Sequence, residues 1–317
     1  MRQSPIFRLF DFLCALVALA PAVVALAALS GIGHRAFDLL AQFPAPVLAA
    51  TAICTLVVAL LRLKTTSLAG LISCALLLAA VWPQWFPKAP AAQDGAPVIT
   101  VYSANLWARN TDVAAMKASI RAADPDIILL VEVGNAPAEN LDLLLEGYPH
   151  RAMSVPGNIT VAPARTLVAS RWPIQAVPEN TRDRLSAMAA IVQTPLGETG
   201  VMAAHLTRPW PYQHQWGQIA QVEDMTSLRP KLGQRAIIAG DFNSVSSARI
   251  GRQVKNSMGL SPAPARLGTW PTFLPPPFGI TIDQVWHSQE LAVVDRKLGR
   301  NNGSDHRPVI TRFTAAR

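Results

Sequence analysis

Residues 236–244 read AIIAGDFNS, a short apolar run followed at once by a glycine, Asp241 and Asn243. Apolar runs bounded by turn residues predict buried strands, so we expect a strand over Ala236 to Ala239. Asp241 and Asn243 then lie just beyond its end. Taken alone, Asp241 to Ser244 fits an Asx turn equally well. The interpretation therefore depends on whether other strands end in the same way.

Five other apolar runs carry polar side chains at or beside their ends. If these groups were merely structural, each would need its own hydrogen-bonded network. Because strands can bring distant ends to one edge, we expect these residues to form one site with Asp241 and Asn243. The runs are Val98 to Ser103 with Asn105, Ile127 to Val133 with Glu132, Val201 to Ala204 with His205, Thr281 to Trp286 with Asp283, and Pro308 to Phe313 with Asp305 and His306.

Strand-like and helical segments alternate irregularly after residue 97, which indicates an α/β fold with mixed sheets rather than an alternating barrel. Further strands are expected over Leu167 to Ser170 and Met188 to Gln193, joined to their neighbours by turns such as Pro195 to Glu198. The proline-rich segment from Pro262 to Pro277 predicts a long surface loop, and such loops often carry function. Helices are expected over Asp112 to Ala123, Tyr212 to Leu228 and Ala248 to Met258.

The N-terminal region differs in composition from the rest of the chain. Only 15% of the 317 residues are charged, whereas about 25% is usual in soluble proteins, and the deficit lies before residue 88. Three uncharged stretches there are each long enough for a bilayer-spanning helix, which takes about 20 apolar residues. We expect an anchor over residues 1–87 with transmembrane helices at about 10–30, 39–61 and 65–87, a linker over 88–97 and one domain over 98–317.

The distribution of Lys and Arg predicts the orientation of this anchor. Four basic residues mark one side of the spans and two mark the other, which puts the N-terminus in the cytoplasm and the domain outside. Cleavage of the first span as a signal peptide gives the same location for the domain. We therefore expect a multi-pass protein of the cytoplasmic membrane with an extracytoplasmic domain. The basic residues are Arg2, Arg8, Arg62 and Lys64 on the first side, and Arg35 and Lys88 on the second.

The overall charge and the cysteines limit the possible partners. A formal net charge of +8 permits an anionic partner, but no block of consecutive Lys and Arg marks a nucleic-acid track. All three cysteines, Cys14, Cys54 and Cys74, lie in the apolar region. The domain consequently has neither a disulfide framework nor a zinc–thiolate site. No obligate protein partner is evident.

The residues at the strand ends suit metal-assisted hydrolysis of a phosphate ester. Oxygen ligands such as Glu132 suit Mg²⁺, which keeps several waters and takes few protein ligands. Asp241 can orient or deprotonate the attacking water, and the imidazoles of His205 and His306 can contact phosphate oxygens. A carboxylate such as Asp283 beside a histidine would fix its tautomer and favour its charged form.

At these residues the chain resembles the endonuclease/exonuclease/phosphatase superfamily of DNase I-like enzymes. The resemblance covers about residues 98–313, and its most specific parts are GDFN and SDHRP with ID between them. It implies a four-layered α/β sandwich with the site at one end. The matching segments are VYSANLW at 101–107, IILLVEV at 127–133, LVASRWPI at 167–174, AAHL at 203–206, AGDFNS at 239–244, GTWPTF at 268–273, TIDQVW at 281–286 and GSDHRPV at 303–309.

The resemblance also implies which residues hold the metal and the substrate. Glu132 would be the principal ligand of Mg²⁺, or of Mn²⁺ in its place. Asn105 would lie near both the metal and the phosphate, and Asp305 would lie close to the metal. Arg171 or Arg208 would add a contact to the phosphate.

The catalytic roles follow from the same resemblance. Asp241 would activate or orient water, Asn243 would hold the scissile phosphate and His205 would stabilise its oxygens. Asp283 and His306 would form an acid–histidine pair.

Two departures weaken an assignment to DNA repair. Gln284 follows the ID where many members have an aromatic residue or His, and Trp107 stands where some repair enzymes have an acid. The anchor and external domain look most similar to the bacterial branch around the teicoplanin-resistance membrane protein, which implies a lipid-linked phosphate or pyrophosphate as substrate. Extracellular DNA or RNA is the alternative, with Trp210, Trp216 and Trp270 as candidate stacking residues. A non-catalytic membrane interaction protein is the third possibility.

Overall fold

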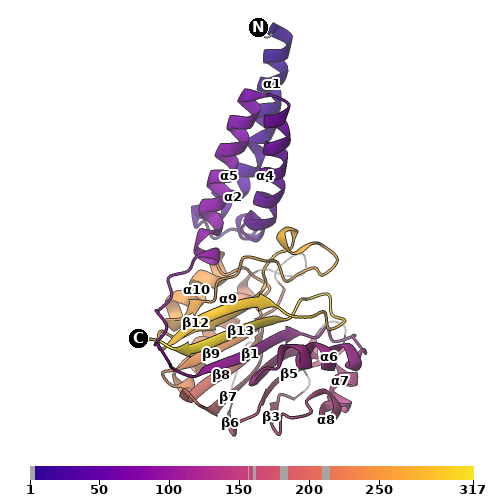
Figure 1. The fold of residues 1–317 in the computed structure, drawn as a ribbon, viewed down its shortest axis with the longest axis vertical. Helices are drawn as coiled ribbons and strands as arrows, with labels where there is room; N and C mark the ends of the chain where they lie inside the picture. Colours follow the sequence, from indigo (N-terminus) through magenta and orange to yellow (C-terminus); the bar gives the residue numbers. More distant parts are fainter. Residues whose placement is uncertain (1–3, 156, 160–161, 179–184, 209–214) are drawn as a thin grey trace.

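A narrow helical bundle built from the N-terminal residues stands on one face of an α/β domain (Figure 1). The computed structural model describes residues 4–155, 157–159, 162–178, 185–208 and 215–317. Within the bundle, α5 packs against α1, α2 and α4. The helices of the N-terminal region are α1 (Pro5–Ala18), α2 (Ala20–Ser30), α3 (Arg35–Leu40), α4 (Pro44–Leu60) and α5 (Lys64–Trp85).

The described residues contain two helical stretches that are long and apolar enough to cross a membrane. They are Pro5–Ser30, which comprises α1 and α2, and α5. α4 is a shorter apolar helix of 17 residues. The predicted middle span was wrong at its start, because α3 ends at Leu40 and α4 begins only at Pro44. Proline suits that position, since its fixed φ and missing N–H favour the first turn of a helix.

Two mixed β-sheets form the centre of the domain. Their strands are β1 (Val98–Asn105), β2 (Ile127–Val133), β3 (His150–Met153), β4 (Gly157–Ile159), β5 (Ala162–Ser170), β6 (Ile174–Val177), β7 (Ser186–Thr194), β8 (Gly197–His205), β9 (Ala236–Asp241), β10 (Ser261–Pro262), β11 (Asp283–His287), β12 (Leu291–Leu298) and β13 (Val309–Ala315). The first sheet has the order β12-β13-β1-β2-β5-β3, with β4 on β5. The second has the order β10-β11-β9-β8-β7-β6. Each predicted strand overlaps one of these strands, and the predicted turn joins β7 to β8 as a hairpin.

Helices cover the outer face of each sheet. Buried residues such as Val101, Val201 and Val285 fill the space between the sheets. Met116 packs beneath the first sheet, and Val222 packs beneath the second. The prediction of two mixed sheets flanked by helices is therefore confirmed. The remaining elements are α6 (Val113–Ala123), α7 (Asn135–Glu139), α8 (Leu141–Leu144), α9 (Trp216–Leu228), α10 (Arg249–Met258) and the short 3₁₀ helices η1 (Arg229–Leu232) and η2 (Pro276–Phe278). Positions 212–214 of the predicted α9 lie outside the described residues.

Strand direction explains why the polar residues meet. β1 runs parallel to β2, and β8 runs parallel to β9, so the ends that carry Asn105, Glu132, His205 and Asp241 point the same way within each sheet. β11 and β13 run antiparallel to these strands, so their beginnings lie at the same edge. Asp283 is thus directly opposite Asp241 in the ladder.

Gly240 lets β9 approach β8 closely at this edge. Its φ is +145°, and a Cβ there would lie 2.1 Å from the carbonyl oxygen of Ala204. Only glycine tolerates this approach. It brings Asp241, the next residue of β9, close to His205 at the end of β8.

The bundle is bonded to the loop that follows Asp241. The backbone N–H of Val245 donates to Oε1 of Gln42 at 2.8 Å. The side chain of Gln84 donates to the carbonyl oxygen of Ala265 at 2.9 Å, and the backbone N–H of Ala265 donates back to the carbonyl of Gln84. Val245 also packs with Ala41 and Leu77 of the bundle. The helical bundle and the domain therefore share a packed, hydrogen-bonded junction.

Candidate active site

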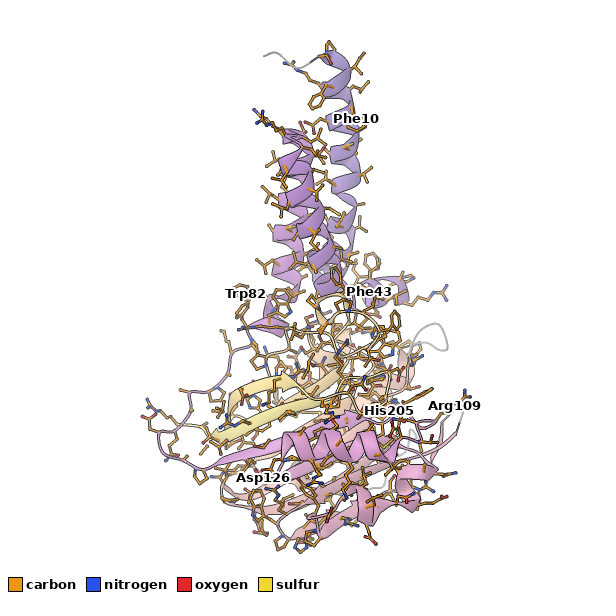
Figure 2. All side chains as sticks on the ribbon, turned by 45° about the vertical axis from the view of Figure 1, so that its right-hand side comes forward. Phe10, Phe43, Trp82, Arg109, Asp126 and His205 are labelled. Atoms are coloured by element: carbon orange, nitrogen blue, oxygen red, sulfur yellow. The ribbon has the colours of Figure 1, made fainter. Side chains whose placement is uncertain are left out.

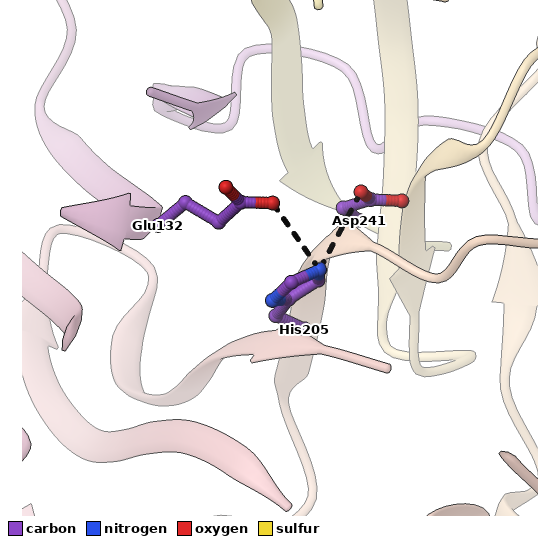
Figure 3. A group of neighbouring side chains, drawn as sticks. All are labelled: Glu132, His205 and Asp241. Atoms are coloured by element: carbon purple, nitrogen blue, oxygen red, sulfur yellow. Dashed lines mark ion pairs between the residues drawn. The ribbon is translucent and has the colours of Figure 1, made fainter. Parts of the chain in front are cut away.

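Glu132, His205 and Asp241 converge at the common edge of the two sheets (Figure 3). Nε2 of His205 lies 3.5 Å from Oε1 of Glu132 and 3.7 Å from Oδ2 of Asp241. The potential ligand atoms of the three residues all lie within 4.8 Å of one another. A second group of the same kind, among the described residues, is Asp241, Asp283 and His306.

The carboxylate of Glu132 is aimed by an irregularity in β2. The register between β2 and β5 shifts between Leu130 and Val133, and Glu132 has a φ of +51°. Such bulges redirect a side chain and often occur beside active sites. Oε2 of Glu132 accepts a hydrogen bond from the backbone N–H of Ala108 at 3.2 Å. Burial raises the pKa of Glu132, but His205 and Asn105 more than offset this, so its pKa is lowered and the carboxylate is ionised.

Asn105 links the two sheets by donating to both carboxylates. Its Nδ2 donates to Oε1 of Glu132 at 2.8 Å and to Oδ2 of Asp241 at 3.1 Å. Its Oδ1 accepts from the backbone N–H of Trp107 at 2.8 Å. The family resemblance implied that Asn105 lies near the metal and the phosphate, and the structure places its side chain between Glu132 and Asp241. The amide presents its N–H groups rather than its oxygen to the two carboxylates.

Asn243 lies beside Asp241 in a left-handed turn with a φ of +46°. Its backbone N–H donates to Oδ1 of Asp241 at 2.8 Å, and its Nδ2 donates to the carbonyl of Leu206 at 2.9 Å. Nδ2 also lies 3.4 Å from Nε2 of His205. Burial raises the pKa of Asp241, with a further increase from Asp283 that opposes the decrease from the histidines. A carboxyl group of raised pKa is a better proton acceptor for water than an ordinary aspartate.

Asp283 and His306 form the predicted pair. Nδ1 of His306 lies 2.9 Å from Oδ2 of Asp283, and Nε2 lies 3.7 Å from Oδ2 of Asp241. Burial lowers the pKa of His306, but Asp283 and Asp241 outweigh it and raise the pKa to about 10. The backbone N–H of Asp283 donates to Oγ1 of Thr269. The imidazole is thus positively charged at neutral pH, with Nε2 directed at Asp241.

Asp305 adjoins His306 and bonds a loop beside the site. Its Oδ2 accepts from Nε1 of Trp270 at 3.0 Å, and its carbonyl oxygen accepts from the backbone N–H of Thr272. Among the described residues, Asp305 belongs to neither group of potential ligand atoms. Its carboxylate holds the loop that contains Trp270, and its place close to the metal stays a prediction.

The two candidate arginines lie in different places. Arg171 follows β5, whose last residue pairs with Ile127 at the start of β2, the opposite end from Glu132. Its guanidinium pairs with Asp124 and lies over the ring of Tyr148 at 5.5 Å. Its predicted contact with the phosphate is therefore wrong. Arg208 lies two residues beyond Leu206, exposed, with its guanidinium 5.9 Å from the ring of Trp270.

Substitution of the two arginines tests this difference. Arg208→Ala is expected to lower kcat/KM about tenfold, which corresponds to the loss of about 1.4 kcal/mol from one charged contact to the substrate. Arg171→Ala is expected to change kcat/KM by less than about twofold, because exposed ion pairs contribute little. Steady-state hydrolysis of bis(p-nitrophenyl) phosphate measures both. Equal losses in the two variants would contradict the placement of Arg171.

The sequence analysis missed Arg296, which supports Asp283 from behind. Its guanidinium donates to the carbonyl oxygen of Asp283 at 3.1 Å. Burial lowers the pKa of Arg296 to about 10, with Asp283 opposing the decrease, so it stays charged beneath the site. β12, which carries it, has an apolar run over Leu291 to Val294 that is followed by three charged residues, Asp295, Arg296 and Lys297. Its register on β13 also shifts between Val293 and Asp295. The apolar run was the signal for this strand, and Arg296 lies beyond it.

Of the tryptophans proposed for base stacking, two lie in the described residues and have different surroundings. Trp270 is held by Asp305 through its indole N–H. Trp216 is exposed at the start of α9. Trp210 lies outside the described residues.

The donor set fits a divalent cation. Two carboxylates and an imidazole surround one point, and the side chain of Glu132 is partly open to solvent. Carboxylate oxygens are hard ligands of the kind that Mg²⁺ and Mn²⁺ prefer. Asn105 donates to both carboxylates, so the two acids lie close together, where a cation would reduce the repulsion between their charges. The cluster can therefore hold a metal beside a phosphate.

Comparison with known proteins agrees with this geometry. The sequence profile of the Endonuclease/Exonuclease/phosphatase family matches residues 102–306. The fold is similar to an endonuclease/exonuclease/phosphatase from Beutenbergia cavernae, at 21% identity and a TM-score of 0.53 over 69% of this chain and 72% of that one. It is also similar to the human Nocturnin catalytic domain, at 18% identity and a TM-score of 0.55 over 72% and 100%. Sphingomyelinase C from Streptomyces griseocarneus is similar at 15% identity and a TM-score of 0.51 over 70% and 100%. No curated protein matches the chain in sequence.

The family profile spans more than half of the chain and includes every strand end from Asn105 to His306. Because the same residues converge on one site, the protein belongs to the endonuclease/exonuclease/phosphatase family and is a phosphoesterase hydrolase.

Proposed function

We propose that the protein is a membrane-anchored, Mg²⁺-dependent phosphoesterase that acts on a lipid-linked phosphodiester, phosphomonoester or pyrophosphate. One observation carries the choice of a membrane substrate. The loop that follows Asp241 and Asn243 is bonded to the bundle, through the N–H of Val245 and Oε1 of Gln42. Val245 is only two residues beyond Asn243, so the anchor holds the catalytic loop itself. A tether of this kind raises the effective concentration of substrates in the same membrane.

The location follows from the bundle. We propose that residues 1–87 form the anchor, with α1–α2, α4 and α5 as its three spans, and that residues 98–317 form an extracytoplasmic domain after a linker over 88–97. α4 has 17 residues, near the lower limit for a span. Trp82 and Phe86 are exposed at the end of the bundle nearest the domain, as expected for an aromatic belt. Arg62 and Lys64 lie exposed at the other end, in the joint between α4 and α5.

Each polar residue then has a place in the reaction. Members of the family typically depend on a divalent metal, and Glu132 would hold Mg²⁺. When bound, the ion neutralises phosphate charge and polarises the phosphoryl group. Asp241 orients a water molecule and takes its proton. Nδ2 of Asn243 and Nε2 of His205, 3.4 Å apart, contact the phosphate oxygens on which negative charge develops.

His306 acts from the other side of Asp241. Its charged imidazole faces the carboxylate of Asp241 at 3.7 Å and stabilises the same phosphate oxygens. Asp283 fixes its orientation through Nδ1.

A comparison of substrates tests the proposal. The full-length protein, reconstituted in vesicles, is incubated with Mg²⁺ or Mn²⁺ and given a long-chain lipid pyrophosphate, a lipid phosphate, bis(p-nitrophenyl) phosphate or supercoiled plasmid. Release of phosphate from lipid at the highest kcat/KM is the expected result. Faster nicking of plasmid would instead support an extracytoplasmic nuclease. Inactivity toward all four substrates, with the wild-type sequence and either metal, would overturn the proposal.

A further inference from the structure

The proline-rich segment from Leu267 to Ile282, which we call the apolar loop, has no ionisable residue in its 16 positions. Several of its apolar side chains nevertheless face solvent. Phe273 is 82% exposed and Leu267 is 42% exposed. Pro275 and Pro277 are exposed as well. Exposed apolar side chains that cluster in one segment mark a candidate site of interaction with a partner or a membrane.

The apolar loop lies at the base of the helical bundle. Its 3₁₀ helix η2 contacts α4, and in Figure 1 the golden turn that carries η2 rises from the domain to the lower end of that helix. Figure 2 places Phe43, just before α4, and Trp82 at the same end of the bundle, on different sides of it in this view. Trp82 is 52% exposed on the outside of α5. The loop is therefore continuous with the aromatic end of the bundle.

The opposite side of the apolar loop is bonded to the active site. Nε1 of Trp270 donates to Asp305, and the N–H of Thr272 donates to the carbonyl of the same residue. The guanidinium of Arg307 donates to the carbonyls of Pro271, Thr272 and Leu274 at 3.1, 2.8 and 2.6 Å. Because Asp305 and Arg307 flank His306, the loop connects the acid–histidine pair to the base of the bundle.

We propose that the apolar loop inserts Phe273 into the interfacial layer of the bilayer, so that a phosphate carried by a lipid reaches His306 along the loop. This inference rests on the proposed function, since it requires that the bundle spans the membrane. Aromatic and proline side chains without charge are suited to the boundary between headgroups and acyl chains. Arg266, exposed beside Leu267 with its guanidinium 4.7 Å from the ring of Phe86, adds a positive charge where lipid phosphates lie.

The bilayer is favoured over a second protein as the occupant of this surface. The loop begins beside the exposed aromatic residues of the bundle, because Arg266 lies over Phe86 and Phe86 packs against Trp82. A membrane around the bundle would contact both. A protein partner would have to exclude lipid from a surface next to the spans. The absence of charge over all 16 positions also removes the ion pairs that usually fix a protein partner in register.

A depth measurement tests the insertion without any substrate. Phe273→Cys is made in the full chain with Cys14, Cys54 and Cys74 replaced by alanine, labelled with a nitroxide and reconstituted in phosphatidylethanolamine–phosphatidylglycerol vesicles. Leu143→Cys is the matched control, because Leu143 is 51% exposed on α8, at the far end of the domain from the bundle (Figure 1). We expect oxygen to relax the label at position 273 more than a water-soluble nickel complex does, and the reverse at position 143. Equal, aqueous behaviour at both positions would overturn the inference.

A second measurement guards against an effect of the cysteine replacements. Phe273→Trp in the otherwise native chain is expected to gain fluorescence that brominated lipids quench, whereas Leu143→Trp is not. If neither tryptophan is quenched, the inference fails.

Turnover separates this inference from the proposed function. Phe273→Asp is expected to lower kcat/KM for a lipid phosphate in vesicles about tenfold and to change that for bis(p-nitrophenyl) phosphate less than about twofold. Leu143→Asp is expected to change neither. A wild-type protein that hydrolyses lipid phosphate while position 273 stays in water refutes the insertion alone. A buried label on a protein that is inert toward lipid refutes the proposed function alone.

Discussion

Glu132→Gln is expected to lower kcat/KM for phosphodiester hydrolysis by about 10²–10³-fold or more, because it removes the ionised oxygen that a cation would contact. The substitution keeps the shape of the side chain. It replaces one carboxylate oxygen, a hydrogen-bond acceptor, by an NH₂ group, which is a donor. That group then faces Nδ2 of Asn105 or the backbone N–H of Ala108, which are donors as well. Catalysis and metal affinity should therefore fall together. Steady-state kinetics over a Mg²⁺ titration measures the first, and calorimetric titration with Mn²⁺ measures the second.

Glu146→Gln is the matched control for this variant. Glu146 is largely exposed and pairs with Lys117 on the helical face of the domain. Its loss should leave both kcat/KM and metal binding unchanged within about twofold, as expected for a surface ion pair. Full activity of Glu132→Gln with Mg²⁺ would remove Glu132 from the site. Loss of activity with unchanged Mn²⁺ affinity would instead assign Glu132 a role other than binding the metal.

Most of the fold could be predicted because its central strands are continuous apolar runs. β2 begins and ends at the predicted residues, Ile127 and Val133, and every residue of it except Glu132 is buried. The edge strands β3, β4, β6, β10 and β12 were missed. All but β12 are four residues long or shorter, and edge strands need only one apolar face. β12 has eight residues, but its apolar start is followed by three charged residues. The start of α4 was missed because Leu39 and Leu40 belong to α3, and residues 41–43, which include Gln42, form a turn beside the domain.

The candidate site could be predicted only as a set of residues. The polar groups that follow apolar runs meet as expected, because Asp283 and Asp241 are opposite each other in the ladder and Asn105 bridges the sheets. Their detailed roles depend on directions that a linear sequence does not contain. Arg171 follows a strand as the others do, but β5 runs antiparallel to β2, so its end lies at the opposite edge. Asp305 adjoins His306 in sequence, yet its carboxylate turns to the indole of Trp270.

Asp283→Asn is expected to lower kcat by about 10²–10⁴-fold, with a much smaller change in KM. The carboxylate holds Nδ1 of His306 at 2.9 Å, and the amide that replaces it cannot supply the negative charge that keeps the imidazole protonated. The side chain itself lies behind the histidine and has no contact with Glu132. The loss therefore concerns the orientation and charge of His306. Asp124→Asn, which removes a carboxylate at the far end of the sheet, is the control and should retain full activity.

The combination of Asp283→Asn with His306→Gln decides whether the aspartate acts through the histidine. Residues that work as one unit give losses that do not multiply, so the double variant should be no less active than His306→Gln alone. Steady-state kinetics of the two single variants and the double variant complete the cycle, and thermal unfolding checks that each protein is folded. If the two losses multiply, Asp283 acts on the substrate or the metal directly. The assignment of Asp283 as the residue that positions His306 would then be wrong.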